Sequence, residues 1–230
     1  IITDIAGLPS ILNTTQSTIT IQDAAESLGA ETTNGKVGSG QHLAIFSFQT
    51  TKQLNNIEGG AIASKNEELI DKCRRIADYG RTKERYVHDI LGMNFRITDV
   101  ASAIGLVQLP NLDKVLHRRN EIASRYQKEI TNLTFQKTPS YVTRHSWWTV
   151  IGLTKNYFER YRILTNLRGR GIDAREPWLP IRRQPCFPNL RPNLLENSNS
   201  DEIWNRGIML PCFNTMNNEQ IDSVIEVANS

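Results

Sequence analysis

Apolar and polar residues alternate along the first third of the chain in short stretches that turn-forming residues separate. The pattern predicts strands over residues 18–23, 43–48 and 59–64. The second of these is apolar at nearly every position and is expected to be buried. A turn-rich segment, residues 34–40, lies between the first two strands. The first strand ends in a carboxylate, Asp23, and the third begins at the Gly59-Gly60 turn.

Helical spacing of apolar residues begins after the third strand. Asn66 is expected to cap a helix whose first turn carries Glu67 and Glu68. Arg74 and Arg75 lie near its end, so the charges complement the helix dipole. Further elements are expected as helices over 99–109, 112–130, 157–168 and 218–228, a strand over 147–153 and irregular structure over 176–200. Strands that alternate with helices are typical of an α/β fold.

Composition excludes several classes of protein. Of the 230 residues, 39% are hydrophobic and 22% are charged, which is ordinary for a globular chain. No apolar run approaches the ~20 residues of a membrane helix, so no membrane partner is expected. The three cysteines, Cys73, Cys186 and Cys212, do not have the spacing of metal ligands and cannot all pair. We therefore expect no metal site and a reducing, cytoplasmic location.

A carboxylate and a lysine follow two of the predicted strands in the first half of the chain. Lys52 comes 29 residues after Asp23, which leaves room for one loop and one strand. Both side chains can therefore lie at the same edge of one sheet. A lysine that can hold an aldehyde, together with an acid that keeps a pyridine nitrogen protonated, suits pyridoxal phosphate. Ser47 and the glycine-rich turns offer hydroxyl and amide donors for a phosphate.

Four segments, in this order along the chain, resemble the DegT/DnrJ/EryC1/StrS family of sugar-nucleotide aminotransferases, and most of all its perosamine synthetase-like branch. They are residues 21–30 (IQDAAESLGA), 46–52 (FSFQTTK), 58–61 (EGGA) and 92–99 (GMNFRITD). The likeness runs from about Ile5 to the C-terminus and is most specific over 21–109. It implies an α/β fold of the aspartate-aminotransferase type, fold type I.

The resemblance also implies a domain organisation. Residues 1–115 are assigned to the C-terminal part of a large, mixed-sheet domain that binds pyridoxal phosphate. Residues 116–130 are expected to form a connecting helix, and residues 131–230 a smaller C-terminal α/β domain. The pattern of apolar positions agrees with this division, because it restarts after about residue 131.

Five residues match functional positions of the family. Lys52 matches the lysine that holds pyridoxal 5′-phosphate and relays the proton during catalysis. Asp23 matches the acid that pairs with the pyridine nitrogen, and Glu26 the residue at the cofactor's 3′-oxygen. Ser47 matches a phosphate-binding serine. Asn94 matches the asparagine that reaches the phosphate in the neighbouring subunit, which implies a homodimer with shared active sites.

The implied reaction transfers an amino group from L-glutamate to a nucleotide-linked 4-keto-6-deoxysugar, for the biosynthesis of amino-dideoxysugars. Lysine at position 52, where dehydratases of the family carry histidine, favours transamination. Residues 171–181 resemble the substrate-side segment, so Arg175 is expected to face the nucleotide diphosphate. His145, in the segment 144–148, is also expected to approach the substrate. Trp147 and Trp148 are expected to form the core and rim of a strand.

Plainer interpretations of these residues stay open. Asp23 and Lys52 also suit solvated surface positions, and Ser47 suits a satisfied hydroxyl in an apolar strand. Asn94 also suits a cap or turn, and His145 a structural histidine. A group of arginines in the second half suits a sugar diphosphate, a nucleic acid or a solvated helix face. Its members are Arg160, Arg162, Arg168, Arg170, Arg175, Arg182, Arg183 and Arg191. With a net charge of only +3, no nucleic-acid partner is expected.

The sequence departs from the family in two places. Asn55, Asn56 and Ile57 stand where relatives usually carry Thr and Gly, which can alter the turn without removing a catalytic group. Family members also carry a long segment ahead of the region that matches Ile5, with a Gly-Thr phosphate-binding turn and a residue that stacks on the pyridine ring. We therefore expect a fragment of a longer protein, a chain completed by another one, or a truncated, non-catalytic relative that acts as an interaction module.

Overall fold

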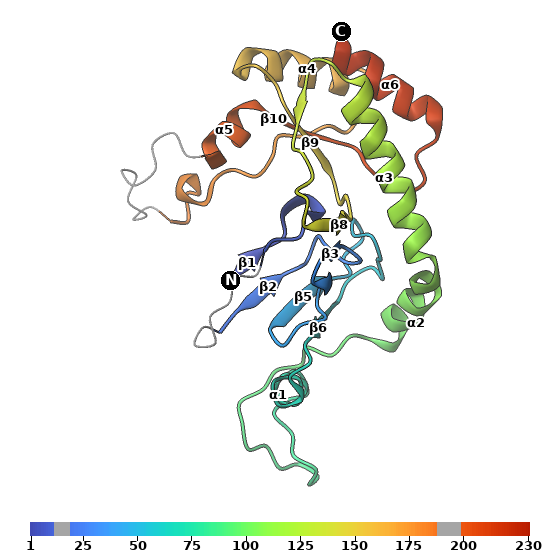
Figure 1. Ribbon diagram of the computed structural model, residues 1–230. Helices are drawn as coiled ribbons and strands as arrows, with labels where there is room; N and C mark the ends of the chain where they lie inside the picture. The colour runs from blue at the N-terminus through green and yellow to red at the C-terminus, as the bar shows by residue number, and fades with distance from the viewer. Residues whose placement is uncertain (12–18, 188–198) are drawn as a thin grey trace. The chain divides into compact units, whose positions relative to one another are not determined.

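The computed structural model describes residues 1–11, 19–187 and 199–230 (Figure 1). The described chain forms two compact units. The first contains Ile1–His117 and Thr138–Trp148, and the second contains Arg118–Lys137 and Thr149–Ser230. The sequence pattern placed residues 138–148 in the second domain. The structure packs them with the first unit, because a short strand in this segment pairs with an early one.

A mixed four-stranded sheet forms the centre of the first unit, in the order β1-β2-β5-β6. Its strands are β1 (Ile2–Thr3), β2 (Ile21–Asp23), β5 (Leu43–Ser47) and β6 (Gly60–Ala63). Strands β1, β2 and β5 run parallel and β6 runs antiparallel to β5. Two predicted strands are confirmed in place. The first is shorter than predicted, and Thr18, its expected start, lies outside the described residues.

Parallel pairing brings the C-terminal ends of β2 and β5 to one edge of this sheet, since Asp23 pairs opposite Ile45. Ala24, Ala44 and Phe46 form the buried cluster beside this edge. Gly38 is needed there because it has φ +82° and an added Cβ would lie 2.8 Å from the Phe46 ring. The turn-rich loop therefore packs against the buried cluster beside the ends of β2 and β5.

A second, smaller sheet in the first unit has the order β4-β3-β8. It joins β3 (Glu31–Thr32) and β4 (Gly35–Lys36) to β8 (Val142–Arg144), all antiparallel. Arg144 strengthens the join, because its Nη2 lies 2.8 Å from Glu31 Oε1 and its Nε donates to Gly29 O at 2.6 Å. This pairing carries residues 145–148 into the first unit.

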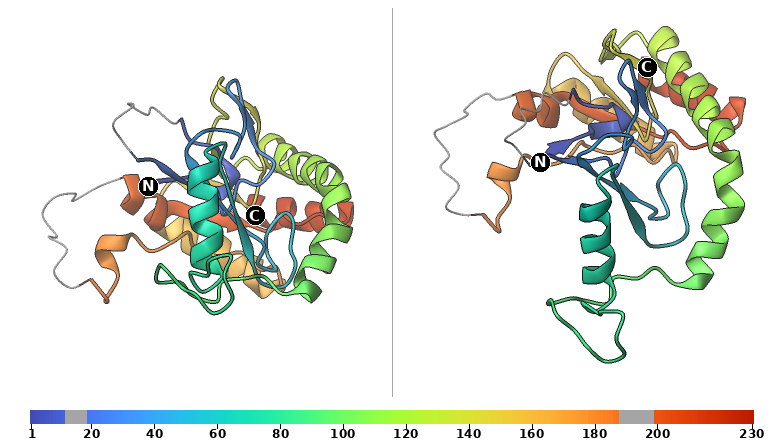
Figure 2. Two further views of the ribbon diagram at one scale, coloured as in Figure 1. Left: turned by 90° about the horizontal axis from the view of Figure 1, so that it is seen from below. Right: turned by 60° about the horizontal axis from the view of Figure 1, so that its bottom comes forward.

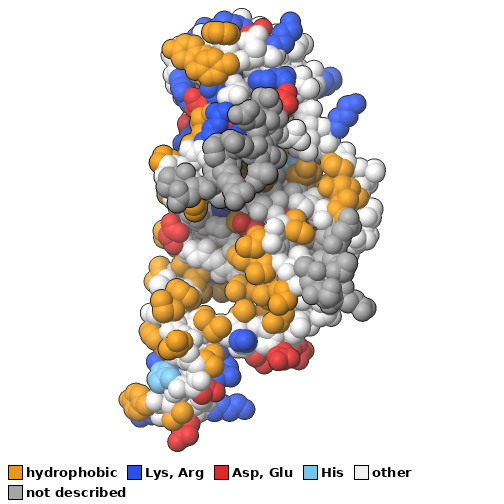
Figure 3. Space-filling view, turned by 90° about the vertical axis from the view of Figure 1, so that its left-hand side faces the viewer, with side chains coloured by type: hydrophobic (Ala, Val, Ile, Leu, Met, Phe, Trp, Pro, Cys, Tyr) orange, Lys and Arg blue, Asp and Glu red, His pale blue; other side chains and the backbone are white. Residues whose placement is uncertain are grey.

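The helical elements of the first unit are the 3-10 turns η1 (Ile5–Gly7) and η2 (Leu109–Asn111), α1 (Glu67–Ala77), α2 (Asp99–Gln108) and the beginning of α3 (Leu112–Glu129). Asn66 caps α1 as predicted, since its side chain accepts from Leu69 N. No residue of α1 is buried. Large apolar side chains between residues 91 and 109 are also exposed. Figure 3 shows that hydrophobic side chains gather on parts of the face that it draws.

The second unit has a three-stranded antiparallel sheet in the order β10-β9-β7. Its strands are β7 (Thr134–Phe135), β9 (Val150–Leu153) and β10 (Gly207–Leu210), and its helical elements are α4 (Tyr157–Gly169), η3 (Ile181–Arg183), α5 (Asn199–Arg206), α6 (Asn218–Asn229) and most of α3. Helices α4 and α6 pack against each other (Figure 2). Tyr126, Ile163, Leu167, Ile208 and Ile221 are among its fully buried side chains. Across the described residues, no helix is long and apolar enough to cross a membrane.

Candidate active site

Lys52 lies in the turn that follows β5. Phe48 N donates to Gly59 O and Asn56 N donates to Phe48 O, both at 2.9 Å, so the intervening residues form a closed loop at the end of the strand. Within it, Lys52 N donates to Gln49 O at 2.9 Å. The loop turns the lysine side chain back over the sheet edge, where only 12% of it is exposed.

Two carboxylates lie within electrostatic reach of the Lys52 amine. Nζ is 3.9 Å from Glu26 Oε1, and the other Glu26 oxygen accepts from Ala6 N at 2.7 Å. Asp23, at the end of β2, accepts from Ala25 N at 3.2 Å and also acts on the lysine charge. The structure therefore brings together Lys52, Glu26 and Asp23, three of the residues predicted from the sequence.

Burial shifts the protonation of this group in the direction of neutral forms. Desolvation lowers the pKa of Lys52, although Glu26 and Asp23 act in the opposite direction. Desolvation also raises the pKa of Glu26, against the effects of the Ala6 N–H and of Lys52. A lysine with a lowered pKa is more often a free amine near neutral pH, which is the form that attacks a carbonyl carbon.

A buried polar pair, Gln53 and Ser146, fixes the lysine turn in place. Gln53 Nε2 donates to Glu26 O at 2.5 Å and to Ser146 Oγ at 3.0 Å. Ser146 Oγ lies 3.1 Å from Gly7 O and 3.0 Å from Glu26 O. Both side chains are almost fully buried. The sequence pattern did not indicate either residue, because their contacts join segments far apart along the chain.

Trp148 is the other site residue that the sequence pattern did not indicate. Its ring centroid lies 4.3 Å from Lys52 Nζ, and its Nε1 donates to Thr51 O at 3.1 Å. The sequence pattern gave it a place at the rim or core of a strand. It instead precedes β9. The resemblance to known proteins marked the neighbouring His145, which is the nearest signal that the sequence contained.

His145 is held beside Trp147 by ring stacking and a hydrogen bond. The two rings stack with centroids 3.6 Å apart and planes 1° from parallel, and His145 Nδ1 accepts from Trp147 N at 3.0 Å. Burial lowers the pKa of His145 to about 3, so the ring is neutral at physiological pH. A neutral, fixed imidazole can accept or donate a hydrogen bond but does not attract a phosphate by charge.

Comparison with known proteins places this geometry in a family. The profile of the DegT/DnrJ/EryC1/StrS aminotransferase family matches residues 3–228. The chain belongs to this family. The GDP-perosamine synthase of Escherichia coli O157:H7 is 31% identical over 210 residues, which cover 91% of this chain and 57% of the synthase.

Two further relatives agree with the family assignment. The UDP-4-amino-4,6-dideoxy-N-acetyl-beta-L-altrosamine transaminase of Campylobacter jejuni serotype O:2 is 33% identical over 210 residues, covering 86% of this chain and 54% of the transaminase. DesV of S. venezuelae, solved with a ketimine intermediate, has a TM-score of 0.90 over 99% of this chain and 63% of DesV, at 22% identity. The predicted aminotransferase fold is confirmed. The chain spans little more than half the length of the curated relatives it matches.

Ser47 and Asn94 also match functional positions of the family. Ser47 ends β5, pairs opposite Gly60 and accepts from Gln49 N at 3.4 Å. Asn94 forms an antiparallel bridge with Asp78 beyond α1, and its side chain is exposed. No described contact joins Asn94 to Lys52. Both roles stay predictions.

Arg175 belongs to the second unit of this DegT-family chain. Its Nε and Nη2 bind the two oxygens of Asp173 at 2.9 and 2.7 Å, and its backbone pairs with Met209. The side chain is 69% exposed. Its predicted contact with a nucleotide diphosphate therefore stays a prediction, and would require the guanidinium to exchange or share Asp173.

Most of the grouped arginines have partners inside the second unit. Arg168 binds Glu176 at 2.6 Å, Arg160 donates to Trp204 O at 2.7 Å, and both Arg182 and Arg183 pair with the buried Asp201. Arg191 lies outside the described residues. This pairing favours the plain interpretation of a charged helical surface over a nucleic-acid site.

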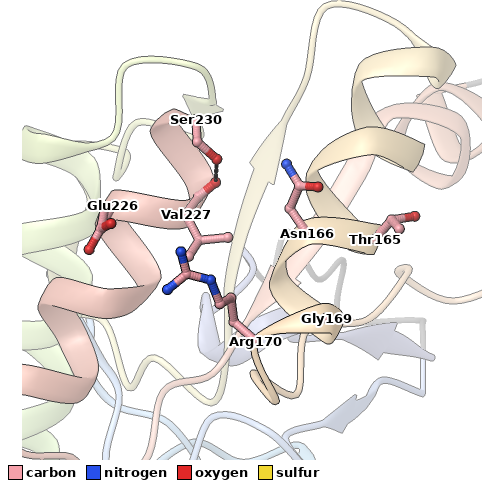
Figure 4. A pocket seen from close by; sticks show the side chains of 7 residues that line it. All are labelled: Thr165, Asn166, Gly169, Arg170, Glu226, Val227 and Ser230. Atoms are coloured by element: carbon pink, nitrogen blue, oxygen red, sulfur yellow. Dashed lines mark hydrogen bonds between the residues drawn. The ribbon is translucent and has the colours of Figure 1, made fainter.

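A separate pocket of about 390 Å³ lies between α4 and α6 (Figure 4). Its lining contains one cation, Arg170, and one anion, Glu226. None of the predicted site residues lines it. Within the described parts of the chain, no group of His, Cys, Asp and Glu side chains is arranged to hold a metal ion.

Proposed function

We propose that the protein to which this chain belongs is a pyridoxal phosphate-dependent aminotransferase. It would transfer an amino group from L-glutamate to the keto carbon of a nucleotide-linked 4-keto-6-deoxysugar, in the cytoplasmic biosynthesis of an amino-dideoxysugar. The observation that carries the proposal is the meeting of Lys52, Glu26 and Asp23 at one edge of the sheet in the first unit. The relatives that are named for perosamine and altrosamine support the substrate class.

The residues around Lys52 fit pyridoxal 5′-phosphate. When bound, this cofactor supplies an aldehyde for a lysine amine and a ring that withdraws electrons from the substrate. Lys52 offers a largely buried amine with a lowered pKa. Asp23 would hold the pyridine nitrogen, Ser47 a phosphate oxygen and Glu26 the 3′-oxygen. The raised pKa of Glu26 suits a carboxyl group that shares a proton with an oxygen.

Lys52 would also move the proton at the reacting carbon. A base for this task works best when its pKa is near the working pH, and burial moves Lys52 in that direction. Lys52 Nζ lies 3.9 Å from Glu26 Oε1, which is longer than a hydrogen bond, so no hydrogen bond to this carboxylate ties the amine down. We assign substrate contacts to His145 and Arg175, as a neutral hydrogen-bonding ring and as a cation for a phosphate.

We further propose a homodimer in which Asn94 serves the partner's site. Asn94 is exposed between Met93 and Phe95, whose side chains are 57% and 66% exposed. Leu106 and Val107 of α2 are exposed at 70% and 74%. A second copy that covers this apolar segment would bring the Asn94 amide to another subunit, where it could bind a phosphate.

The proposed role of Lys52 is tested by trapping the cofactor. The full chain is incubated with pyridoxal 5′-phosphate, reduced with borohydride and digested, and the modified peptide is identified by mass spectrometry. We expect stoichiometric modification at Lys52, none at that peptide in Lys52→Ala, and unchanged modification in the control Lys65→Ala, which removes an exposed lysine. Modification scattered over surface lysines would contradict the proposal.

The alternative is a non-catalytic relative that acts as an interaction module. The exposed apolar segment between residues 91 and 109 favours it as a second candidate. Addition of L-glutamate to the cofactor-loaded chain separates the two. Formation of 2-oxoglutarate with loss of the visible cofactor band would eliminate the alternative, whereas cofactor uptake without 2-oxoglutarate would favour it.

A further inference from the structure

The Lys52 amine has two neighbours of different kinds. Glu26 Oε1 lies 3.9 Å from Nζ, at the outer limit of an ion pair, and the Trp148 ring centroid lies 4.3 Å from the same atom. A cation that close to the face of an indole ring is attracted by the ring's quadrupole. The carboxylate supplies charge without a hydrogen bond, and the ring supplies an aromatic face beside the amine.

Trp148 is itself fixed in its place. Its Nε1 donates to Thr51 O, the carbonyl immediately before Lys52, at 3.1 Å. Two residues earlier, Ser146 is anchored to Gly7 O and to Gln53, the residue immediately after Lys52. The tryptophan segment therefore holds the lysine turn on both sides of Lys52, and the indole cannot leave the amine without breaking these bonds.

We propose that Trp148 is a positioning residue that holds the Lys52 amine above the sheet edge, between its indole face and Glu26. The proposal rests on the assignment of Lys52 as the cofactor lysine. A cofactor lysine has to leave its position and return to it in each half-reaction. An indole face retains a cation without a directional bond, so the amine is kept near the aldehyde position but stays free to move.

Two carboxylates act on the charge of Lys52. Glu26, from the turn after β2, and Asp23, at the end of β2, both stabilise the ammonium form. Trp148 comes from the segment after β8 and adds no charge. Replacement of the ring by an aliphatic side chain therefore removes the quadrupole attraction, keeps most of the burial, and favours the neutral amine.

The test measures the amine directly and without bound cofactor. The full chain is acetylated with acetic anhydride across a pH series, and the acetylation rate of the Lys52 peptide gives its pKa. We expect Trp148→Leu to lower this pKa by about half a unit to one unit. Trp148→Phe, which keeps an aromatic face, should restore most of the difference.

Two controls separate positioning from general damage. Trp147→Leu removes the neighbouring ring, which stacks on His145, and should leave the pKa of Lys52 unchanged. Circular dichroism checks that each variant is folded. An unchanged pKa in folded Trp148→Leu, or an equal shift in Trp147→Leu, would overturn the proposal. If Trp148→Leu lowers the pKa of Lys52 but the wild-type chain never traps the cofactor at Lys52, the positioning contact stands and the proposed function fails.

Discussion

Single residues of the site divide into those that a local motif reveals and those that it does not. Asp23, Glu26 and Lys52 were predicted because each lies inside a short segment that resembles its counterpart in the family. Ser146 and Trp148 were not, because their contacts reach 93 and 97 residues back along the chain. Nothing in a local pattern states which distant turn a side chain will meet.

One residue near the lysine has an unfavourable backbone conformation. Ile57 has φ +78°, a region that β-branched residues rarely occupy. It falls in the segment where the sequence departs from the family, which usually has Gly there. Ile57 therefore adopts a backbone conformation that glycine would adopt without strain.

We expect Ile57→Gly to stabilise the protein. Release of the left-handed strain should contribute about 1–2 kcal/mol, and the greater flexibility of glycine in the unfolded chain should remove about 0.5–1 kcal/mol of it. The side chain is 54% exposed, so little burial is lost. Urea unfolding measures the change. Ile62→Gly, at a similarly exposed position inside β6, should destabilise. A loss of stability in Ile57→Gly would contradict this account.

Secondary-structure elements were predictable where they are long and capped. The helix beginning at residue 67 and those beginning at 99, 157 and 218 each have an Asn or Thr whose side chain accepts from the third residue on. Their starts agree with the sequence pattern for this reason. Strands β3, β4 and β8 have two or three residues each, too short to show a period. They were therefore missed, and with them the placement of residues 138–148.

The cap of α6 gives a prediction at this scale. Asn217 accepts from Gln220 N at 2.8 Å and Gln220 Oε1 accepts from Asn217 N at 3.0 Å, which forms a capping box. Asn217→Ala should lower the free energy of unfolding by about 1 kcal/mol. The same change at Asn166, which is exposed inside α4, should raise the free energy of unfolding by a few tenths of a kcal/mol, because alanine has the higher helix propensity. Thermal unfolding of both variants compares them, and equal effects would contradict the capping argument.

At the scale of the whole molecule, two compact units share helix α3, which changes unit after His117. The sequence pattern located this helix well, since 112–130 was expected and Leu112–Glu129 is observed. The unit boundaries could not be read in the same way, because the first unit is discontinuous along the chain. The exposed apolar side chains between residues 91 and 109 bear on the association of whole molecules.

If a second copy covers that segment, a charge within it should prevent association. We expect Leu106→Glu to convert dimers to monomers in sedimentation velocity measured over a range of concentrations, because a carboxylate would have to be desolvated in the interface. Phe158→Glu is the control, since Phe158 is 80% exposed on α4 of the second unit. It should leave association unchanged. A wild-type chain that stays monomeric at all concentrations would refute the dimer.

The contact between Gly7 and Ser146 has a consequence for synthesis of the protein. A nascent chain that has emerged from the ribosome as far as residue 137 already contains Lys52 and both carboxylates, but it lacks Ser146 and Trp148. At that stage the lysine turn lacks its contacts with Trp148 and Ser146, and closing so long a loop is a slow step of folding. The amine therefore gains its indole contact only after Trp148 has been translated, which postpones the completed site until that segment has been made.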